Sequence, residues 1–216
     1  MKRLVIFGFD GTLADTSPGI LYCLNTTVAS MGYAPVKHDE LYGIIGIPLK
    51  QGLKKLFNMN EDEIEYAANN YSKLYSQKGK EMFTVYDGMA DVLKELKKNK
   101  MMLAVATQKH IMFASDMLET YESGDIFDAV CATDVDTNLT KSDLLLQACE
   151  RLGVSVEESV LIGDSYIEAQ EAEKIGMDFV AVLYGWGFKC KEDAEKFNCS
   201  ASVSSASEIT SKVLTL

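Results

Sequence analysis

Residues 4–16 read LVIFGFDGTLADT, an apolar run that passes directly into a turn. The run at 4–7 is apolar at every position, as expected of a strand buried on both faces of a sheet. The Gly-Phe-Asp-Gly-Thr turn at 8–12 is rich in main-chain N–H donors and carries one acid, Asp10. Such a turn at the end of a buried strand indicates a segment that holds a ligand at its tip.

Short apolar runs recur along the chain and alternate with amphipathic helices. Four further buried strands are predicted, at 102–106, 128–132, 160–163 and 179–183. Two of the helices between them show apolar residues at helical spacing, namely Met89, Val92, Leu93 and Leu96 in one and Leu144, Leu145, Ala148 and Leu152, closed by Gly153, in the other. The Ser-rich end at 200–211 predicts a weak edge strand and a final helix. This alternation predicts an α/β fold, a Rossmann-like doubly wound parallel sheet with helices on both faces.

The segment 17–82 interrupts this rhythm, because it has helical signals and no convincing strand. Its clearest helix shows apolar residues at helical spacing after an acidic start, namely Ile64, Ala67, Ala68, Tyr71, Leu74 and Tyr75. We therefore expect a small helical domain at 17–82 inserted into an α/β core domain made of 1–16 and 83–216. The loop GIIGIPL at 43–49 either faces the pocket and helps to select substrate or forms simple turns.

Composition limits the classes of partner. The net charge of −11 repels phosphate backbones and anionic lipid, which disfavours nucleic acid and membrane surfaces as partners. The five cysteines show no C-x-x-C pair and no zinc-ligand spacing beside histidine, which favours thiols in a reducing compartment. The apolar run at 4–7 is too short for a signal peptide, and no stretch has the apolar length of a membrane helix. We expect a cytoplasmic protein.

Polar residues capable of binding a phosphoryl group follow the predicted strands. They are the turn at 8–12, Thr107, Gln108 and Lys109 after the second strand, Lys141 at a helix start, and Asp164 and Glu168 after the fourth strand. Ligands of such sheets bind beyond the carboxyl ends of the strands, where these residues converge. Carboxylates suit Mg²⁺, and lysine, hydroxyl and turn N–H groups suit phosphate oxygens. Lys109 either reaches the substrate or is a solvated surface lysine.

Four ordered stretches of the chain resemble the motifs of the haloacid dehalogenase superfamily. They are FDGTLADT (9–16), the hydroxyl of Thr107, Lys141 and GDSYIEAQEAEKIGM (163–177), followed by VAVLYGWG (180–187). The chain is most similar to phosphoglycolate phosphatase-like members, which carry a helical cap domain after the first motif. The resemblance implies a Mg²⁺-dependent phosphomonoester hydrolase that acts on a small phosphorylated metabolite, with 17–82 as its cap.

The resemblance also implies a role for each site residue. Asp10 is the general acid and base, and its main-chain carbonyl is a Mg²⁺ ligand. The phosphate-binding residues are Gly11, Thr12, Thr107, Gln108 and Lys141. Asp164 and Glu168 are the side-chain Mg²⁺ ligands, although Glu168 stands where aspartate is usual, and its extra methylene shifts the metal or places a water between them.

The main departure from the family pattern is Gly8, which occupies the position of the nucleophilic aspartate. A glycine forms no aspartyl-phosphate, and loss of a nucleophile costs roughly 10⁶-fold in turnover in a well-studied hydrolase. We expect negligible hydrolysis of a general phosphomonoester by this chain and strong recovery in Gly8→Asp. Two functions stay open, an enzyme framework with impaired activity and a non-catalytic protein that binds a phosphorylated metabolite. Gly8 as a harmless residue that eases the strand into the turn is the simpler alternative.

Overall fold

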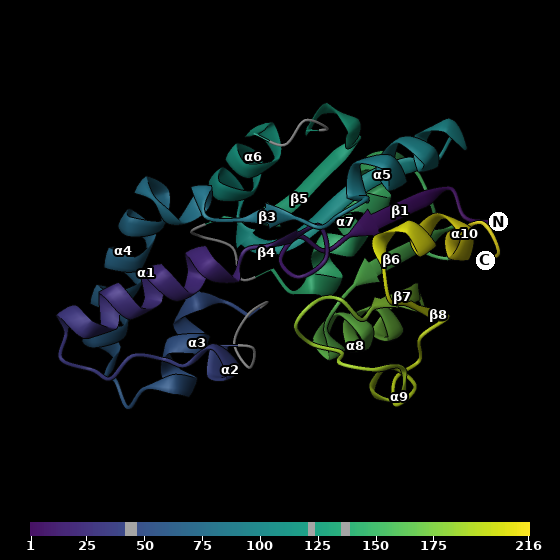
Figure 1. Cartoon of the computed structure of the whole chain (residues 1–216). Coiled ribbons are helices and arrows are strands. Elements are labelled where there is room, and N and C mark those ends of the chain that lie inside the picture. Colours follow the sequence, from purple (N-terminus) through teal and green to yellow (C-terminus); the bar gives the residue numbers. More distant parts are fainter. Residues whose placement is uncertain (42–46, 121–123, 135–138) are drawn as a thin grey trace. The chain divides into compact units, whose positions relative to one another are not determined.

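The computed structural model describes residues 1–41, 47–120, 124–134 and 139–216. Its main feature is a six-stranded sheet with the order β5-β4-β1-β6-β7-β8 (Figure 1). The strand bounds are Leu4–Phe7 for β1, Met102–His110 for β4, Ala129–Thr133 for β5, Ser159–Gly163 for β6, Asp178–Val182 for β7 and Ala201–Val203 for β8. Within the described residues, the neighbouring strands of this sheet pair in parallel, so the predicted α/β, doubly wound class is confirmed.

Strand β1 lies inside the sheet between β4 and β6. Its register pairs Phe7 with Val105 on one side and with Ile162 on the other. The chain builds the sheet outward from β1, through β4 and β5 in one direction and through β6, β7 and β8 in the other. The carboxyl ends of β1, β4 and β6 therefore form the switch point at which α/β sheets of this kind bind ligands.

Helices cover the sheet, and their apolar residues form the core. They are α5 (Met89–Lys98), α6 (Ile111–Thr120), α7 (Lys141–Leu152), α8 (Tyr166–Lys174), α9 (Lys191–Ala194) and α10 (Ile209–Val213), with 3₁₀ turns at Gly124–Ile126 and Ala206–Glu208. Leu144, Leu145 and Ala148 of α7 pack with Leu4 and Ile6 of β1 in one buried cluster. The stripes predicted for α5 and α7 are thus the faces that these helices bury.

The chain divides into two compact units, 1–14 with 85–216 (the core unit) and 15–84 (the helical unit). The helical unit contains α1 (Ser17–Ser30), α2 (His38–Leu41), α3 (Leu49–Leu56), α4 (Glu61–Gln77) and a 3₁₀ turn at Gly79–Glu81. It has its own buried cluster, which includes Leu24, Leu53 and Ile64. The unit boundaries fall inside two short paired strands, β2 (Ala14–Asp15) and β3 (Thr84–Val85).

Strand β4 differs from its expected range. The strand was expected to end at residue 106, but it continues to His110 because His110 pairs with Thr133 of β5 after an irregularity in the ladder. Thr107, Gln108 and Lys109 therefore lie within the last part of β4 instead of in a loop after it.

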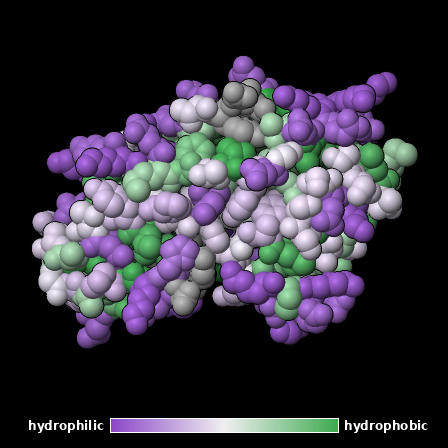
Figure 2. All heavy atoms as spheres, viewed as in Figure 1, coloured by the Kyte–Doolittle hydropathy of each residue, from purple (hydrophilic) through white to green (hydrophobic). Residues whose placement is uncertain are grey.

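The predicted role of the loop 43–49 is not addressed by the structure, because residues 43–46 lie outside the described residues. Within the described part of the chain, no helix combines the length and apolar character that a bilayer crossing needs. Figure 2 shows hydrophilic side chains over much of the face in view, with apolar residues in small patches.

Candidate functional site

Gly8 lies directly after β1, and its N–H donates to the carbonyl of Ile162 at 2.9 Å. A Cβ atom at Gly8 would lie 2.5 Å from Oε1 of Glu168 and 3.0 Å from Oγ1 of Thr12. The first distance is shorter than real Cβ contacts, so the space that a side chain of residue 8 would enter is already taken by the Glu168 carboxylate.

The turn after Gly8 folds tightly against β6 and the segment after β7. The N–H groups of Leu13 and Ala14 both donate to the carbonyl of Phe9, at 3.0 and 3.2 Å. Gly11 has φ +76°, and a Cβ there would collide with the Asp164 carboxyl group. Only glycine therefore suits this position, since the turn needs both the left-handed backbone and the close approach to Asp164.

Thr12 is fully buried, and its carbonyl accepts a hydrogen bond from the Tyr184 hydroxyl at 3.0 Å. Its own hydroxyl Oγ1 has no hydrogen-bond partner among the described residues. Buried hydroxyls are nearly always hydrogen-bonded, so this group points to an acceptor that is missing beside Gly8.

Asp10 forms an ion pair with Lys109, with Oδ1 and Nζ separated by 2.9 Å. The two side chains are only 13% and 7% exposed, so Lys109 is not the solvated surface lysine of the simpler interpretation. The Lys109 Nζ also lies 5.9 Å from the centre of the Phe9 ring. The main-chain N–H of Lys109 donates to the hydroxyl of Thr107 at 3.1 Å, which links the acid of the turn to the end of β4.

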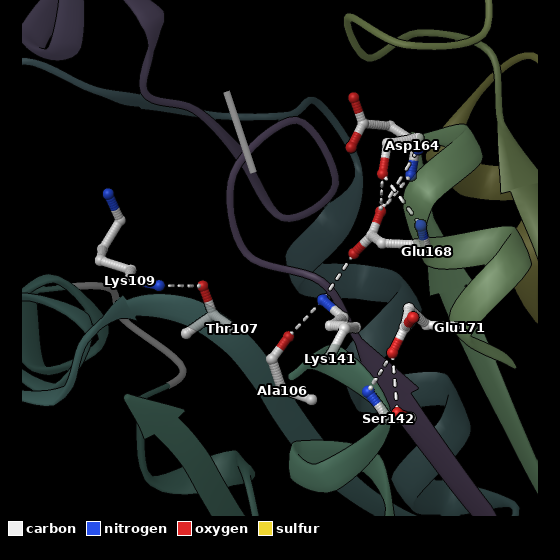
Figure 3. Close-up of polar contacts among 9 residues, drawn as sticks. Ala106, Thr107, Lys109, Lys141, Ser142, Asp164, Glu168 and Glu171 are labelled. Atoms are coloured by element: carbon white, nitrogen blue, oxygen red, sulfur yellow. Dashed lines mark hydrogen bonds and ion pairs between the residues drawn. The ribbon is translucent and has the colours of Figure 1, made fainter. Parts of the chain in front are cut away.

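Lys141 is the first residue of α7, and its side chain is buried (Figure 3). Thr140 caps the helix in a reciprocal arrangement with Asp143, which fixes where the helix begins and where Lys141 points. The Lys141 Nζ donates to the carbonyl of Ala106 at 2.6 Å and pairs with Oε1 of Glu168 at 2.6 Å. This lysine therefore joins α7 to β4 and α8.

Asp164 follows β6 and is buried. Its Oδ2 accepts hydrogen bonds from the main-chain N–H groups of Trp186 at 2.8 Å and Gly187 at 3.2 Å. Burial, together with the nearby charge of Glu168, raises the pKa of Asp164 to about 7. Trp186 and Gly187 were missed as functional residues, although the segment 180–187 that contains them was recognised as part of the resemblance.

Glu168 has both carboxylate oxygens engaged. Oε2 accepts from the N–H of Asp164 at 3.0 Å and from the N–H and hydroxyl of Ser165 at 3.3 and 3.1 Å, which caps the start of α8. Oε1 pairs with Lys141. Figure 3 shows the Glu168 carboxylate between Asp164 and Lys141, whereas Glu171, one turn later, turns to Ser142 instead.

The donor set does not fit a built Mg²⁺ site. Of the two acids expected as side-chain ligands, Glu168 is bound to Lys141 and to the start of its own helix. Residue 8 adds no carboxylate, and the described residues contain no group of three or more His, Cys, Asp or Glu side chains able to hold a metal. Mg²⁺ is usually bound through one or two carboxylates, with waters and phosphate oxygens completing the octahedron. Among the described residues, Asp164 is the one expected side-chain ligand that is not paired with a lysine.

Most of the expected site residues lie together. Gly8, Gly11, Thr12, Lys141, Asp164 and Glu168 are joined by the contacts above, and Asp10 and Thr107 are joined to each other through Lys109. Gln108 is the exception, because its side-chain amide donates to the main-chain carbonyl of Leu139 at 3.3 Å. The N–H groups of Gly11 and Thr12 are used within the turn, on the carbonyls of Ala14 and Phe9. The arrangement therefore gathers a lysine and the hydroxyls of Thr12 and Thr107 near the ends of β1 and β4.

The chain resembles known proteins over most or all of its length. A family model described as haloacid dehalogenase-like hydrolase matches residues 5–182. The chain is 29% identical over 197 residues to a phosphoglycolate phosphatase of Psychrobacter arcticus (87% of this chain, 86% of that protein). It is 30% identical over 193 residues to a phosphoglycolate phosphatase of Agrobacterium fabrum (86% and 82%). A solved structure described as a predicted phosphatase from Clostridium acetobutylicum superposes with a TM-score of 0.92 at 28% identity, with 100% of both chains covered.

Proposed function

The chain belongs to the haloacid dehalogenase-like hydrolase family, and we propose that it is a phosphomonoester hydrolase framework from which the covalent step is missing. The observation that carries this proposal is the placement of Gly8. It lies at the end of the central strand β1, beside Thr12 and Glu168, and Lys141 contacts the same Glu168 carboxylate. Phosphoryl-binding groups thus gather around a position that has no carboxylate.

Each retained residue has a role in the proposed chemistry. Lys141 and the hydroxyls of Thr107 and Thr12 bind the phosphoryl oxygens, and Gly11 shapes the turn beside them. Asp10 exchanges protons, and its pairing with Lys109 fixes the position of the acid. We propose that Gln108 assists at the edge of the phosphate site, although its amide contacts Leu139 here.

In a complete site, a carboxylate oxygen at residue 8 would attack phosphorus while the bond from phosphorus to the leaving oxygen breaks. Asp10 would donate its proton to that oxygen, then take one from the water that releases inorganic phosphate. Gly8 offers no atom for the first bond, so the sequence of steps does not begin. We therefore propose negligible turnover, of the order of 10⁶-fold below that of a complete enzyme.

The substrate class proposed is a small phosphorylated metabolite of the phosphoglycolate type. Its support is the similarity to two proteins named phosphoglycolate phosphatase over more than four-fifths of this chain. We propose that the helical unit acts as the cap that selects the substrate. We also propose a cytoplasmic location, since all five cysteines are free thiols. Mg²⁺ is the metal that the family resemblance implies, and we propose that this chain binds it weakly because its ligand set is incomplete.

The second candidate is a non-catalytic protein that binds a phosphorylated metabolite. It is favoured by the retention of Lys141 and Thr107 as buried residues in a site without a nucleophile. The two candidates share the phosphoryl site and differ in whether any turnover remains.

Two measurements on the whole chain test the proposal. Hydrolysis of para-nitrophenyl phosphate should be at the background rate, and robust turnover would contradict the proposal. Inorganic phosphate should bind, and Thr107→Val should weaken that binding by about tenfold or more, the worth of one hydrogen bond to an anion. Thr120→Val on α6 removes a threonine hydroxyl away from the site, one that donates to the main-chain carbonyl of Met117. It is the control and should bind phosphate as the wild type does.

A further inference from the structure

The pairing of Gly8 with Glu168 suggests a role for Glu168 that the metal-ligand expectation does not include. The Glu168 Oε1 atom lies 2.5 Å from where a Cβ of residue 8 would stand. The unpartnered hydroxyl of Thr12 lies 3.0 Å from the same point. Residue 8 has lost a carboxylate relative to the family pattern, and residue 168 carries one that is longer by a methylene. The longer side chain reaches the space that the missing one leaves.

The positive charge of Lys141 is already balanced by the carboxylate of Glu168. A lysine ammonium has three donors, and Lys141 uses one on the Ala106 carbonyl and one on Glu168. Both partners of the pair are almost buried, with side chains 7% and 10% exposed, so their interaction is poorly screened by water. A phosphoryl dianion that approaches Lys141 therefore meets a neutralised cation and a neighbouring negative charge.

We propose that Glu168 is an internal counter-anion of the phosphoryl site. Its carboxylate occupies the space of the missing side chain of residue 8 and competes with phosphate for Lys141. The inference rests on the proposed function, since it assigns the competition to the same phosphoryl site. Glu168 is thus a positioning residue that holds Lys141 when no ligand is bound and lowers the affinity of the site for phosphate.

The test is calorimetric titration of inorganic phosphate into the whole chain, at a pH where phosphate is mainly a dianion. Glu168→Gln removes the charge but keeps an oxygen that caps α8, because glutamine serves in this capping arrangement as glutamate does. We expect Glu168→Gln to bind phosphate about tenfold or more tightly than the wild type, the change expected for one charge-assisted contact. Glu171→Gln, an acid on the same helix that contacts Ser142, is the control and should leave the affinity within about twofold.

Thermal unfolding gives a second readout. Without phosphate, Glu168→Gln should unfold at a lower temperature, because Lys141 is left buried without its partner. Phosphate should then raise the unfolding temperature of Glu168→Gln more than that of the wild type. A residue with a purely structural role would lower stability without tightening phosphate binding. Glu168→Asp, whose shorter side chain withdraws from Lys141, should bind phosphate with intermediate affinity and serves if Glu168→Gln fails to fold.

The outcomes separate this inference from the proposed function. Equal phosphate affinity in the wild type and in the Glu168 variants, or weaker binding in the variants, would overturn the competition and leave the phosphoryl site standing. No phosphate binding by the wild type or by any folded variant would overturn both.

Discussion

At the scale of single residues, Gly8 and Glu168 form a coupled pair. The carboxylate of Glu168 lies where a side chain at residue 8 would begin, and Lys141 holds it there. The effects of substituting Gly8 and of substituting Glu168 are therefore not independent, because substitutions of residues in contact do not change activity or stability additively. This coupling changes what a simple repair of residue 8 should achieve.

Gly8→Asp alone should restore little hydrolysis of para-nitrophenyl phosphate. The new side chain can enter only if the Glu168 carboxylate shifts away from residue 8, and both acids then compete for one lysine. We expect a gain far below the roughly 10⁶-fold that a nucleophile supplies in a well-studied hydrolase. This expectation replaces the recovery expected from the motif alone. Gly8→Asn, which has the same size without the charge, is the control. An equal gain in Gly8→Asn would show that the carboxylate at residue 8 plays no part.

Gly11→Ala should both destabilise the protein and abolish phosphate binding. The φ angle of +76° strains any side chain at this position, and the new methyl group would strike the Asp164 carboxyl group. Gly88→Ala is a matched control in the same unit, because its φ is +80° and no atom lies within 4 Å of the added Cβ. Chemical denaturation should show a loss of about 1 kcal/mol for Gly88→Ala and a larger loss for Gly11→Ala. Equal losses would contradict the close approach of the turn to Asp164.

At the scale of elements, two capped helix starts position the charged side chains of the site. Thr140 and Asp143 cap α7 and set the direction of Lys141, and Ser165 and Glu168 cap α8. The amino-terminal ends of these helices and the carboxyl ends of the strands meet at the switch point beside β1. The geometry of the site therefore depends on where these helices begin as well as on its own side chains.

Thr140→Ala should cost about 1 kcal/mol of stability and also weaken phosphate binding, because the first turn of α7 carries Lys141. Asn60→Ala removes the corresponding cap of α4 in the helical unit and should cost similar stability without an effect on phosphate binding. The side-chain and main-chain hydrogen bonds of Thr140 lower the pKa of Asp143. That contribution is present above the ordinary carboxyl pKa and is lost as the pH falls through the lowered value. The stability difference between wild type and Thr140→Ala should thus shrink in acid, and a difference that grows there would contradict the cap.

The elements of the fold were largely predictable from the sequence, whereas several contacts of the site were not. Apolar runs and helical stripes depend on local pattern, and β1 and α7 begin at the predicted residues. Two contacts depend on how separate segments meet, which no local pattern encodes. They are the ion pair of Asp10 with Lys109 and the hydrogen bond from the Trp186 N–H to Asp164. Glu168 was identified as a site residue, but its pairing with Lys141 and its approach to Gly8 are contacts that only the folded chain reveals.

At the scale of the whole molecule, two units with separate buried clusters make up the chain. Leu53 is fully buried in the helical unit, and Leu161 is fully buried in the sheet. Leu-to-Ala substitution at such positions costs about 2–5 kcal/mol. We expect Leu53→Ala to reduce amide-exchange protection mainly within 15–84, and Leu161→Ala to reduce it mainly within the core unit. Equal loss of protection across both units in either variant would contradict this separation.

The measurement that tests the central claim most directly is the turnover of para-nitrophenyl phosphate, with Mg²⁺ present, by Gly8→Asp/Glu168→Asp. The double variant returns a carboxylate to residue 8 and shortens residue 168 so that it vacates the same space. The wild type and the two single variants are measured beside it. We predict that only the double variant recovers several of the roughly six orders of magnitude that a nucleophile supplies. A folded, phosphate-binding double variant that remains as inactive as the wild type, or a Gly8→Asp single variant that matches it, would contradict the account.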